Sequence, residues 1–227
     1  KKILLSAVAI CSLLITEAQP LNTPQASPTQ TVKQNFGLSS IELSYSRPGI
    51  KGRKVFGDLV PFGKVWRTGA NNATILTFAD EVTIGGTKIP AGKYGLLTIP
   101  EATEWTIIIS KQTDVTSPDA YKQDQDLVRV KVSPTEMPFS IETFTIMFNE
   151  MTANSCNLGI MWDKTYVSLP ISTDVDTKVM KAIDNIMNKD NKPYFNAASY
   201  YYDNGKDLDL ALGWINKATE ASPNAQP

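Results

Sequence analysis

Residues 73–110 read ATILTFADEVTIGGTKIPAGKYGLLTIPEATEWTIIIS, and this stretch decides the fold class. Short apolar runs alternate with turn residues, and no run keeps the three- to four-residue spacing of an amphipathic helix. Gly85-Gly86 is a two-residue hairpin signal, because glycine tolerates the positive φ that such turns require. KYGLLTI and EWTIIIS are almost continuously apolar, which is typical of strands covered on both faces. The stretch therefore predicts consecutive antiparallel strands.

The same pattern extends outward from about Thr31 to Thr173. Further β-type segments, separated by turn residues, are SSIELSYS, LVRVKV, ETFTIMFN, CNLGIMW and TYVSLPI. About ten short strands with hairpin signals between them favour an antiparallel β-sandwich or jelly roll over residues 31–173. Within it we expect three aromatic or small apolar side chains to be buried: Trp105, Trp162 and Cys156.

After Thr173 the period changes to that of a helix. Apolar residues recur at helical spacing in DVDTKVMKAIDNIMNK, with Asp174 or Asp176 as the N-cap. Two more helices are predicted from Pro193 to about Tyr202 and over residues 208–220. Their apolar spacing resembles one tetratricopeptide repeat. Because one repeat cannot bury its own core, we expect the helices of residues 174–227 to pack on the sandwich; the alternative is a docking module for a partner protein.

The N-terminus has the pattern of an export signal. Lys1-Lys2 precede an apolar run from Ile3 to Ile15, which is too short for a stable membrane anchor. We expect a signal peptide over residues 1–18, a flexible leader over residues 19–30 and a mature protein that is periplasmic or extracellular without a membrane span. Loss of Cys11 with the signal would leave Cys156 alone, so no internal disulfide is expected.

The composition excludes several kinds of chemistry. The chain contains no histidine, which rules out Ser-His-Asp and Cys-His catalysis and typical zinc sites. No nucleotide-binding glycine motif occurs, and a net charge of −1 argues against a nucleic-acid partner. No cofactor or metal is predicted. The acidic clusters are expected at turns and helix starts, where carboxylates act as caps: Asp124 and Asp126; Asp174 and Asp176; Asp203, Asp207 and Asp209.

Cations gather in one segment, between residues 31 and 72, where Lys and Arg greatly outnumber Asp and Glu. Glycine and proline mark much of it as loop, and loops on a rigid scaffold are frequent binding sites. The candidate ligand-binding residues combine guanidinium, ammonium, indole and amide groups: Arg47, Lys51, Arg53, Trp66, Arg67, Asn71 and Asn72. In the alternative interpretation Arg47 and Arg67 hold backbone carbonyls, Trp66 packs in the core and Asn71 supplies a left-handed turn.

These loops also carry a resemblance to a known family. SYSRPGIKGRKVFGDLVPFGKVWRTGAN at residues 44–71 and IPAGKYGLLTIP at residues 89–100 resemble the uncharacterised secreted bacterial family called domain of unknown function 2911. The tail YYYDNGKDLDLALGWINKA is similar as well, so the resemblance extends over most of the expected mature chain. It implies an exported, β-rich domain and supplies no catalytic residues.

Three functions compete on this basis. The first is an exported module that binds an anionic or sugar-like small molecule through RPGIKGR and VWRTGANN. The alternative is a cell-envelope protein that binds a partner protein through the helical hairpin. The third is a carboxylate-dependent hydrolase, for which no motif is present. Catalysis is not expected, because the common nucleophile motifs are missing.

Overall fold

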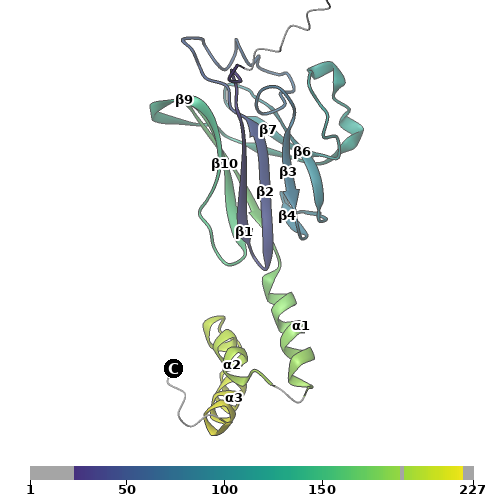
Figure 1. The fold of residues 1–227 in the computed structure, drawn as a ribbon, viewed down its shortest axis with the longest axis vertical. Coiled ribbons are helices and arrows are strands. Elements are labelled where there is room, and N and C mark those ends of the chain that lie inside the picture. Colours follow the sequence, from purple (N-terminus) through teal and green to yellow (C-terminus); the bar gives the residue numbers. More distant parts are fainter. Residues whose placement is uncertain (1–22, 190–191, 222–227) are drawn as a thin grey trace, which may run out of the picture.

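The structure, a computed structural model, describes residues 23–189 and 192–221. The predicted signal peptide and the first residues of the predicted leader lie outside these ranges. The chain is mainly β, with two antiparallel sheets followed by three helices, which confirms the predicted fold class at this level (Figure 1).

The larger sheet has six strands, all joined to their neighbours in antiparallel register. In spatial order they are β1 (Thr29–Phe36), β2 (Ser39–Ser46), β3 (Thr74–Phe78), β6 (Gly92–Ile99), β7 (Trp105–Ser110) and β8 (Asp126–Val132). Strand β1 is absent from the predicted set, because TQTVKQNF is mostly polar. Its residues alternate between exposed and half-buried positions and pair with all of β2, from Thr29 opposite Ser46 to Phe36 opposite Ser39. Strand β1 therefore begins inside the segment expected to be a leader.

The smaller sheet has four strands in the order β5 (Thr87–Ile89), β4 (Val82–Ile84), β10 (Ser155–Ser172) and β9 (Thr135–Asn149). The predicted Gly85-Gly86 hairpin joins β4 to β5, and both glycines have positive φ, +55° and +78°. Such a turn suits glycine because a Cβ is disfavoured there.

The segments CNLGIMW and TYVSLPI, which were predicted as separate strands, form the two halves of β10. The two halves fold back on each other near Asp163, where φ is +50° and the pairing with β9 shifts register. A straight strand would separate Gly159 from Tyr166 by about 23 Å. Instead, a Cβ placed on Gly159 would lie 2.9 Å from the Tyr166 ring. The inward-facing positions accordingly change from even numbers, ending at Trp162, to odd numbers, beginning at Val167.

Both sheets contribute to one hydrophobic cluster. Ile41, Leu76 and Leu96 come from the larger sheet, and Leu158 and Leu169 come from the smaller one; all are fully buried. The buried Tyr45 hydroxyl joins the sheets, since it donates to the Ile146 carbonyl at 3.1 Å and accepts from the Ile146 amide at 2.9 Å.

The expected burial of three side chains within this cluster is confirmed. Trp105, Trp162 and Cys156 are each no more than 2% exposed. Burial raises the pKa of the Cys156 thiol to about 11, so the reactive thiolate is strongly disfavoured at neutral pH.

The helices are α1 (Val175–Met187), α2 (Tyr194–Asp203) and α3 (Leu208–Ala221). Asp174 is the N-cap of α1, because its Oδ1 accepts from the Thr177 amide at 3.0 Å. None of the helices in the described ranges is long and apolar enough to cross a membrane.

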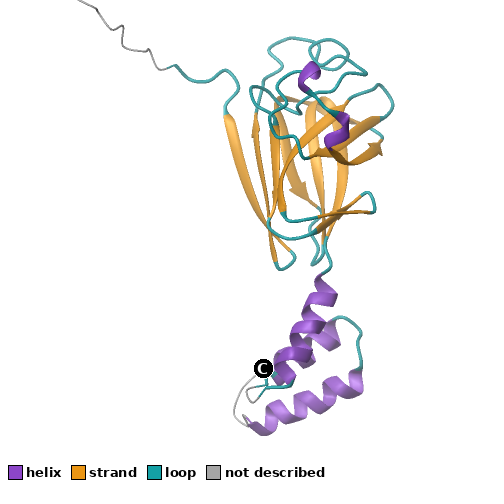
Figure 2. Cartoon of the chain, turned by 90° about the vertical axis from the view of Figure 1, so that its right-hand side faces the viewer, coloured by secondary structure: helices purple, strands orange, loops and turns teal. Residues whose placement is uncertain are grey.

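The helices form a hydrophobic cluster of their own, in contrast to the expected packing on the sheets. Its buried members include Ile183, Ala197 and Tyr201, and it contains no residue of either sheet. The helical segment extends from one end of the β region, which comprises residues 29–172 (Figures 1 and 2). An ion pair between Lys178 and Asp80 holds α1 to that end. Ala197, Ala198, Tyr201 and Ala211 are buried inside this cluster, so part of the apolar surface of α2 and α3 is covered by the helices themselves and not by a sheet.

Candidate functional site

A cavity of about 380 Å³ lies between two loops of the β region. One loop is residues 47–73, which connect β2 to β3, and the other is residues 111–125, which connect β7 to β8. Isolated bridges and two short 3₁₀ helices, Pro118–Ala120 and Gln123–Gln125, fix these loops near the end of the sheets opposite the α helices (Figure 2). The cavity is therefore formed by connections and backed by rigid strands.

The charged side chains that line the cavity are all cations: Arg53, Lys64 and Arg67. Arg53 folds back on its own loop, where Nε donates to the Ile50 carbonyl at 2.9 Å and Nη2 to the Gly49 carbonyl at 2.7 Å. Lys64 is exposed. No salt bridge within the described ranges joins any of the three to a carboxylate. The lining therefore carries uncompensated positive charge.

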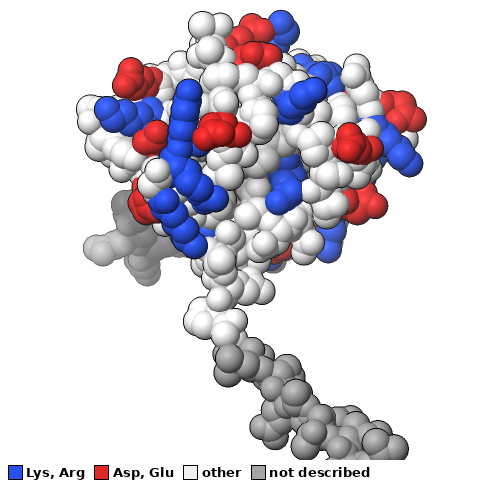
Figure 3. Space-filling model, turned by 90° about the horizontal axis from the view of Figure 1, so that it is seen from above, with Lys and Arg blue, Asp and Glu red and all other residues white. Residues whose placement is uncertain are grey.

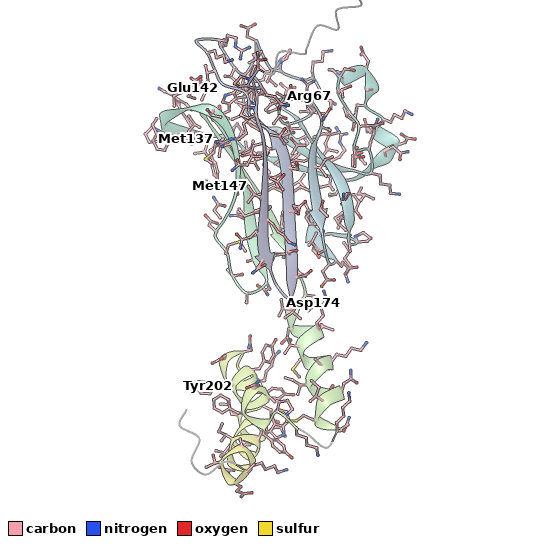
Figure 4. The ribbon with its side chains drawn as sticks, in the orientation of Figure 1. Arg67, Met137, Glu142, Met147, Asp174 and Tyr202 are labelled. Carbon is pink, nitrogen blue, oxygen red and sulfur yellow. The ribbon has the colours of Figure 1, made fainter. Side chains whose placement is uncertain are left out.

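Arg67 connects the two loops. Its Nη1 donates to the carbonyl of Thr116, 49 positions away in the chain. Its Nε is buried and has no hydrogen-bond partner among the described residues. An unpaired buried N–H costs about 1–3 kcal/mol, so this donor favours an additional acceptor. Figure 4 shows Arg67 at the loop end of the β region.

Two tryptophans form the apolar wall of the cavity. The rings of Trp66 and Trp162 stack with centroids 5.9 Å apart and planes 17° apart. Phe56 and Phe144 pack edge-on against both indoles. The Trp66 Nε1 donates to the Gly69 carbonyl at 3.0 Å. Trp66 therefore packs against the core, as the alternative interpretation holds, and is not a free stacking platform.

The other predicted residues lie outside this cavity. Arg47 braces the loop against β9, because Nε donates to the Phe144 carbonyl at 3.0 Å and Nη2 to the Thr145 hydroxyl at 2.8 Å. Asn71, at φ +58°, donates through Nδ2 to the Ser27 carbonyl at 3.0 Å and holds the segment that precedes β1. These two side chains support backbone.

Lys51 and Asn72 also stay out of the cavity. The backbone amide of Lys51 donates to Glu142 Oε1 at 2.9 Å, and its side chain is exposed. Asn72 lines a separate hollow next to Lys93 and Asp114. The predicted constellation of seven residues therefore divides, and only Arg53, Trp66 and Arg67 reach the same cavity.

Several cavity residues were missing from the predicted site, among them Lys64, Thr116 and Ser117. Lys64 belongs to the basic segment and lies directly after Pro61-Phe62-Gly63. That position in a turn is the sequence signal that could have placed it at the site. Thr116 and Ser117 come from the second loop, and nothing in the sequence connects QTDVTSPDA with residues 47–73. Both line the cavity, and the Thr116 carbonyl accepts a hydrogen bond from Arg67.

The positive charge is local to the cavity. Seen from above, the loop end of the β region carries Lys and Arg side chains interspersed with Asp and Glu (Figure 3). A surface of mixed sign exerts little long-range attraction at physiological salt, where the Debye length is about 8 Å. Selection for an anion therefore depends on short-range contacts inside the cavity.

Asp174 and Asp176, one of the predicted acidic clusters, serve as a helix cap and an ion-pair partner away from the cavity. The hydrogen bond from the Thr177 amide lowers the pKa of the Asp174 cap. Hydrogen bonds from Lys206 and then Tyr200 lower the pKa of Asp176. The described residues include no group of three or more His, Cys, Asp or Glu side chains that is arranged to hold a metal ion. Nothing in these clusters supports hydrolase chemistry.

Tyr121, within the second loop, makes a pH-dependent contribution to stability. Burial, followed by its hydrogen bond to Asp126, raises the pKa of Tyr121 to about 12. Because the fold favours the neutral phenol, this contribution to stability is complete below pH 10 and is lost as the pH rises through about 12. We expect the phenolate absorbance difference between the wild type and Tyr121→Phe to titrate near pH 12. A midpoint near the ordinary value of 10 would contradict this.

Comparison with known proteins identifies a family. No significant match was found among curated proteins or among solved structures. A family model described as a protein of unknown function, DUF2911, covers residues 27–171, which is almost the whole β region and none of the α helices. The chain belongs to the DUF2911 family of proteins of unknown function.

Proposed function

We propose that this chain is an exported binding module that holds a small organic anion in the cavity between residues 47–73 and 111–125. The observation that carries the proposal is the lining, in which Arg53, Lys64 and Arg67 are accompanied by no carboxylate. Export rests on the signal-like pattern of residues 1–18. The single hydrophobic cluster shared by both sheets supports a sandwich as the rigid scaffold.

The guanidinium groups supply the directional part of recognition. Guanidinium N–H groups bind carboxylate or phosphate oxygens with charge-assisted hydrogen bonds, which are about twice as strong as neutral ones. Arg67 is held by Thr116 and retains a buried Nε without a partner. An anionic oxygen or an ordered water next to it satisfies that donor. Lys64, three positions before Arg67 on the same loop, adds a second charge to the lining.

The remaining wall favours a ligand with an apolar part. Leu59, Val60, Pro61 and Pro118 line the cavity together with the edges of the two tryptophans. A volume of about 380 Å³ is within the range of about 300–1,000 Å³ that is typical of small-molecule sites. Because the Trp66 ring is covered by neighbouring aromatic rings, a neutral sugar gains no stacking surface there. An organic acid, such as an aromatic carboxylate or a uronate, suits the lining better.

Neutralising Lys64 tests this proposal. We expect Lys64→Gln to weaken binding of phenyl phosphate or glucuronate about three- to tenfold, because one exposed charge contact is worth about 1 kcal/mol. Isothermal titration calorimetry of the purified mature chain measures the change. Glucose, which is neutral, serves as the ligand control.

A matched variant guards against a general charge effect. Lys54→Gln makes the same change on the same loop, and Lys54 is exposed and does not line the cavity. Its affinity should equal that of the wild type. Equal weakening in both variants, or binding of glucose as strong as that of glucuronate, would refute an anion site in this cavity.

A further inference from the structure

A second concave surface lies on the helices. An apolar groove of about 410 Å³ runs between α2 and α3, and we call it the hairpin groove. Its lining residues are aliphatic or aromatic apart from Ser199: Ala198, Ser199, Tyr202, Leu208, Ala211, Leu212 and Ile215. Tyr202, Leu208 and Leu212 are 73%, 57% and 58% exposed, although side chains of this kind normally gain stability from burial. The groove therefore presents apolar surface that the described chain leaves open.

Neither α1 nor the β region covers this groove. The helical cluster buries Ala197 and Tyr201 of α2 together with Ile183 of α1, whereas Tyr202, Leu208 and Leu212 of the groove are not part of it. Figure 4 shows Tyr202 on the side of the hairpin that is turned away from α1. The sheets lie beyond the start of α1 (Figure 1). Because the DUF2911 match ends at residue 171, the groove also belongs to a part of the chain outside the family model.

The rim of the groove is acidic. Helical spacing places Asp203 four positions after Ser199 on α2, and Asp209 three positions before Leu212 on α3. Neither carboxylate has a salt bridge within the described ranges. The neighbouring cation Lys206 is already paired with Asp176 at 2.7 Å. Positive charge on an occupant is therefore complementary to this rim.

We propose that the hairpin groove binds an amphipathic helix of another protein, whose apolar stripe is flanked by Lys or Arg. Apolar side chains at positions i, i+3, i+4 and i+7 are the usual anchors of a helix in a groove. A second copy of this chain fits less well, because symmetric contact would bring two acidic rims together. An anionic membrane surface is disfavoured by the same repulsion. This inference is independent of the anion cavity.

Two synthetic helices test the proposal with the full mature chain. Both carry the same leucine stripe; one is flanked by lysine and the other by glutamate. In fluorescence anisotropy we expect the lysine-flanked peptide to bind at least about tenfold more tightly at low salt, and the difference to shrink as salt is added. Asp203→Asn with Asp209→Asn should reduce that difference. Equal binding of the two peptides, or no binding of either, overturns the proposal.

Leucine variants locate the binding surface. Leu208→Gln with Leu212→Gln should weaken the lysine-flanked peptide about tenfold or more, and the exposure of both side chains leaves the fold intact. Leu210→Gln is the matched control, because Leu210 lies on the same helix, is 42% exposed and does not line the groove. Equal loss in both variants overturns the proposal. So does sedimentation of the chain as a dimer that Leu208→Gln with Leu212→Gln converts to a monomer.

Discussion

Replacing Trp162 with alanine is expected to lower the free energy of unfolding of the β region by about 3–5 kcal/mol. The side chain is 2% exposed and lies in an aromatic cluster, stacked on Trp66 and with its ring centroid 5.5 Å from that of Phe144. Its Nε1 also donates to the Glu142 carbonyl at 3.2 Å. The substitution opens a void and removes the wall of the anion cavity. Urea unfolding monitored by far-ultraviolet circular dichroism measures the loss.

The conservative variant separates packing from hydrogen bonding. Trp162→Phe keeps an aromatic ring and loses the donor to Glu142, so we expect a smaller destabilisation, of about 1–3 kcal/mol. If Trp162→Ala unfolded at nearly the same urea concentration as the wild type, the aromatic cluster would not be the centre of the core. The same result would show that the tryptophan wall of the cavity is not held rigidly.

Gly95→Ala is expected to destabilise the β region by about 3 kcal/mol or more. Gly95 lies in β6 between Ile75 on β3 and Ser110 on β7. A Cβ at this position would overlap the carbonyl oxygen of Gln112, which belongs to backbone and cannot rotate away. The start of the second cavity loop would have to move. Urea unfolding measures the effect, and anion binding should weaken along with stability.

Gly213→Ala supplies the control for this prediction. The chemical change is the same, but no atom lies within 4 Å of the added Cβ, and the residue is inside α3. Alanine is favoured over glycine in a helix by about 1 kcal/mol, so this variant should be neutral or stabilising. Equal stability of Gly95→Ala and the wild type would show that the loop adjusts freely at Gln112.

Local chemistry made most of the sheet predictable. Gly85-Gly86 specifies a turn through its backbone freedom, and EWTIIIS specifies a buried strand through its composition. β1 is not predicted, because TQTVKQNF is mostly polar and its strand conformation depends on pairing with β2. The break between CNLGIMW and TYVSLPI was predicted, but the way the two halves fold back on each other at Asp163 was not, since no glycine or proline marks a tight turn there. Both features depend on partners that are distant in sequence.

The site was predictable only in part, and the reason is geometric. Charge density singled out the loop that carries Arg53, Lys64 and Arg67. It does not distinguish a guanidinium that faces open space from one that braces backbone, as Arg47 does with Phe144. The contribution of Thr116 depends on a contact across 49 positions. Such a contact follows from the tertiary fold and has no signature in the local sequence.

The separation of the two hydrophobic clusters affects how this protein diversifies over time. Because no helix side chain completes the packing between the sheets, substitutions in the hairpin leave the stability of the β region unchanged when they are far from the Lys178–Asp80 contact. The exposed residues of the hairpin are then constrained mainly by whatever they touch outside the chain. Replacement of α2 and α3 by a different helical tail is therefore expected to leave the cavity between residues 47–73 and 111–125 unchanged.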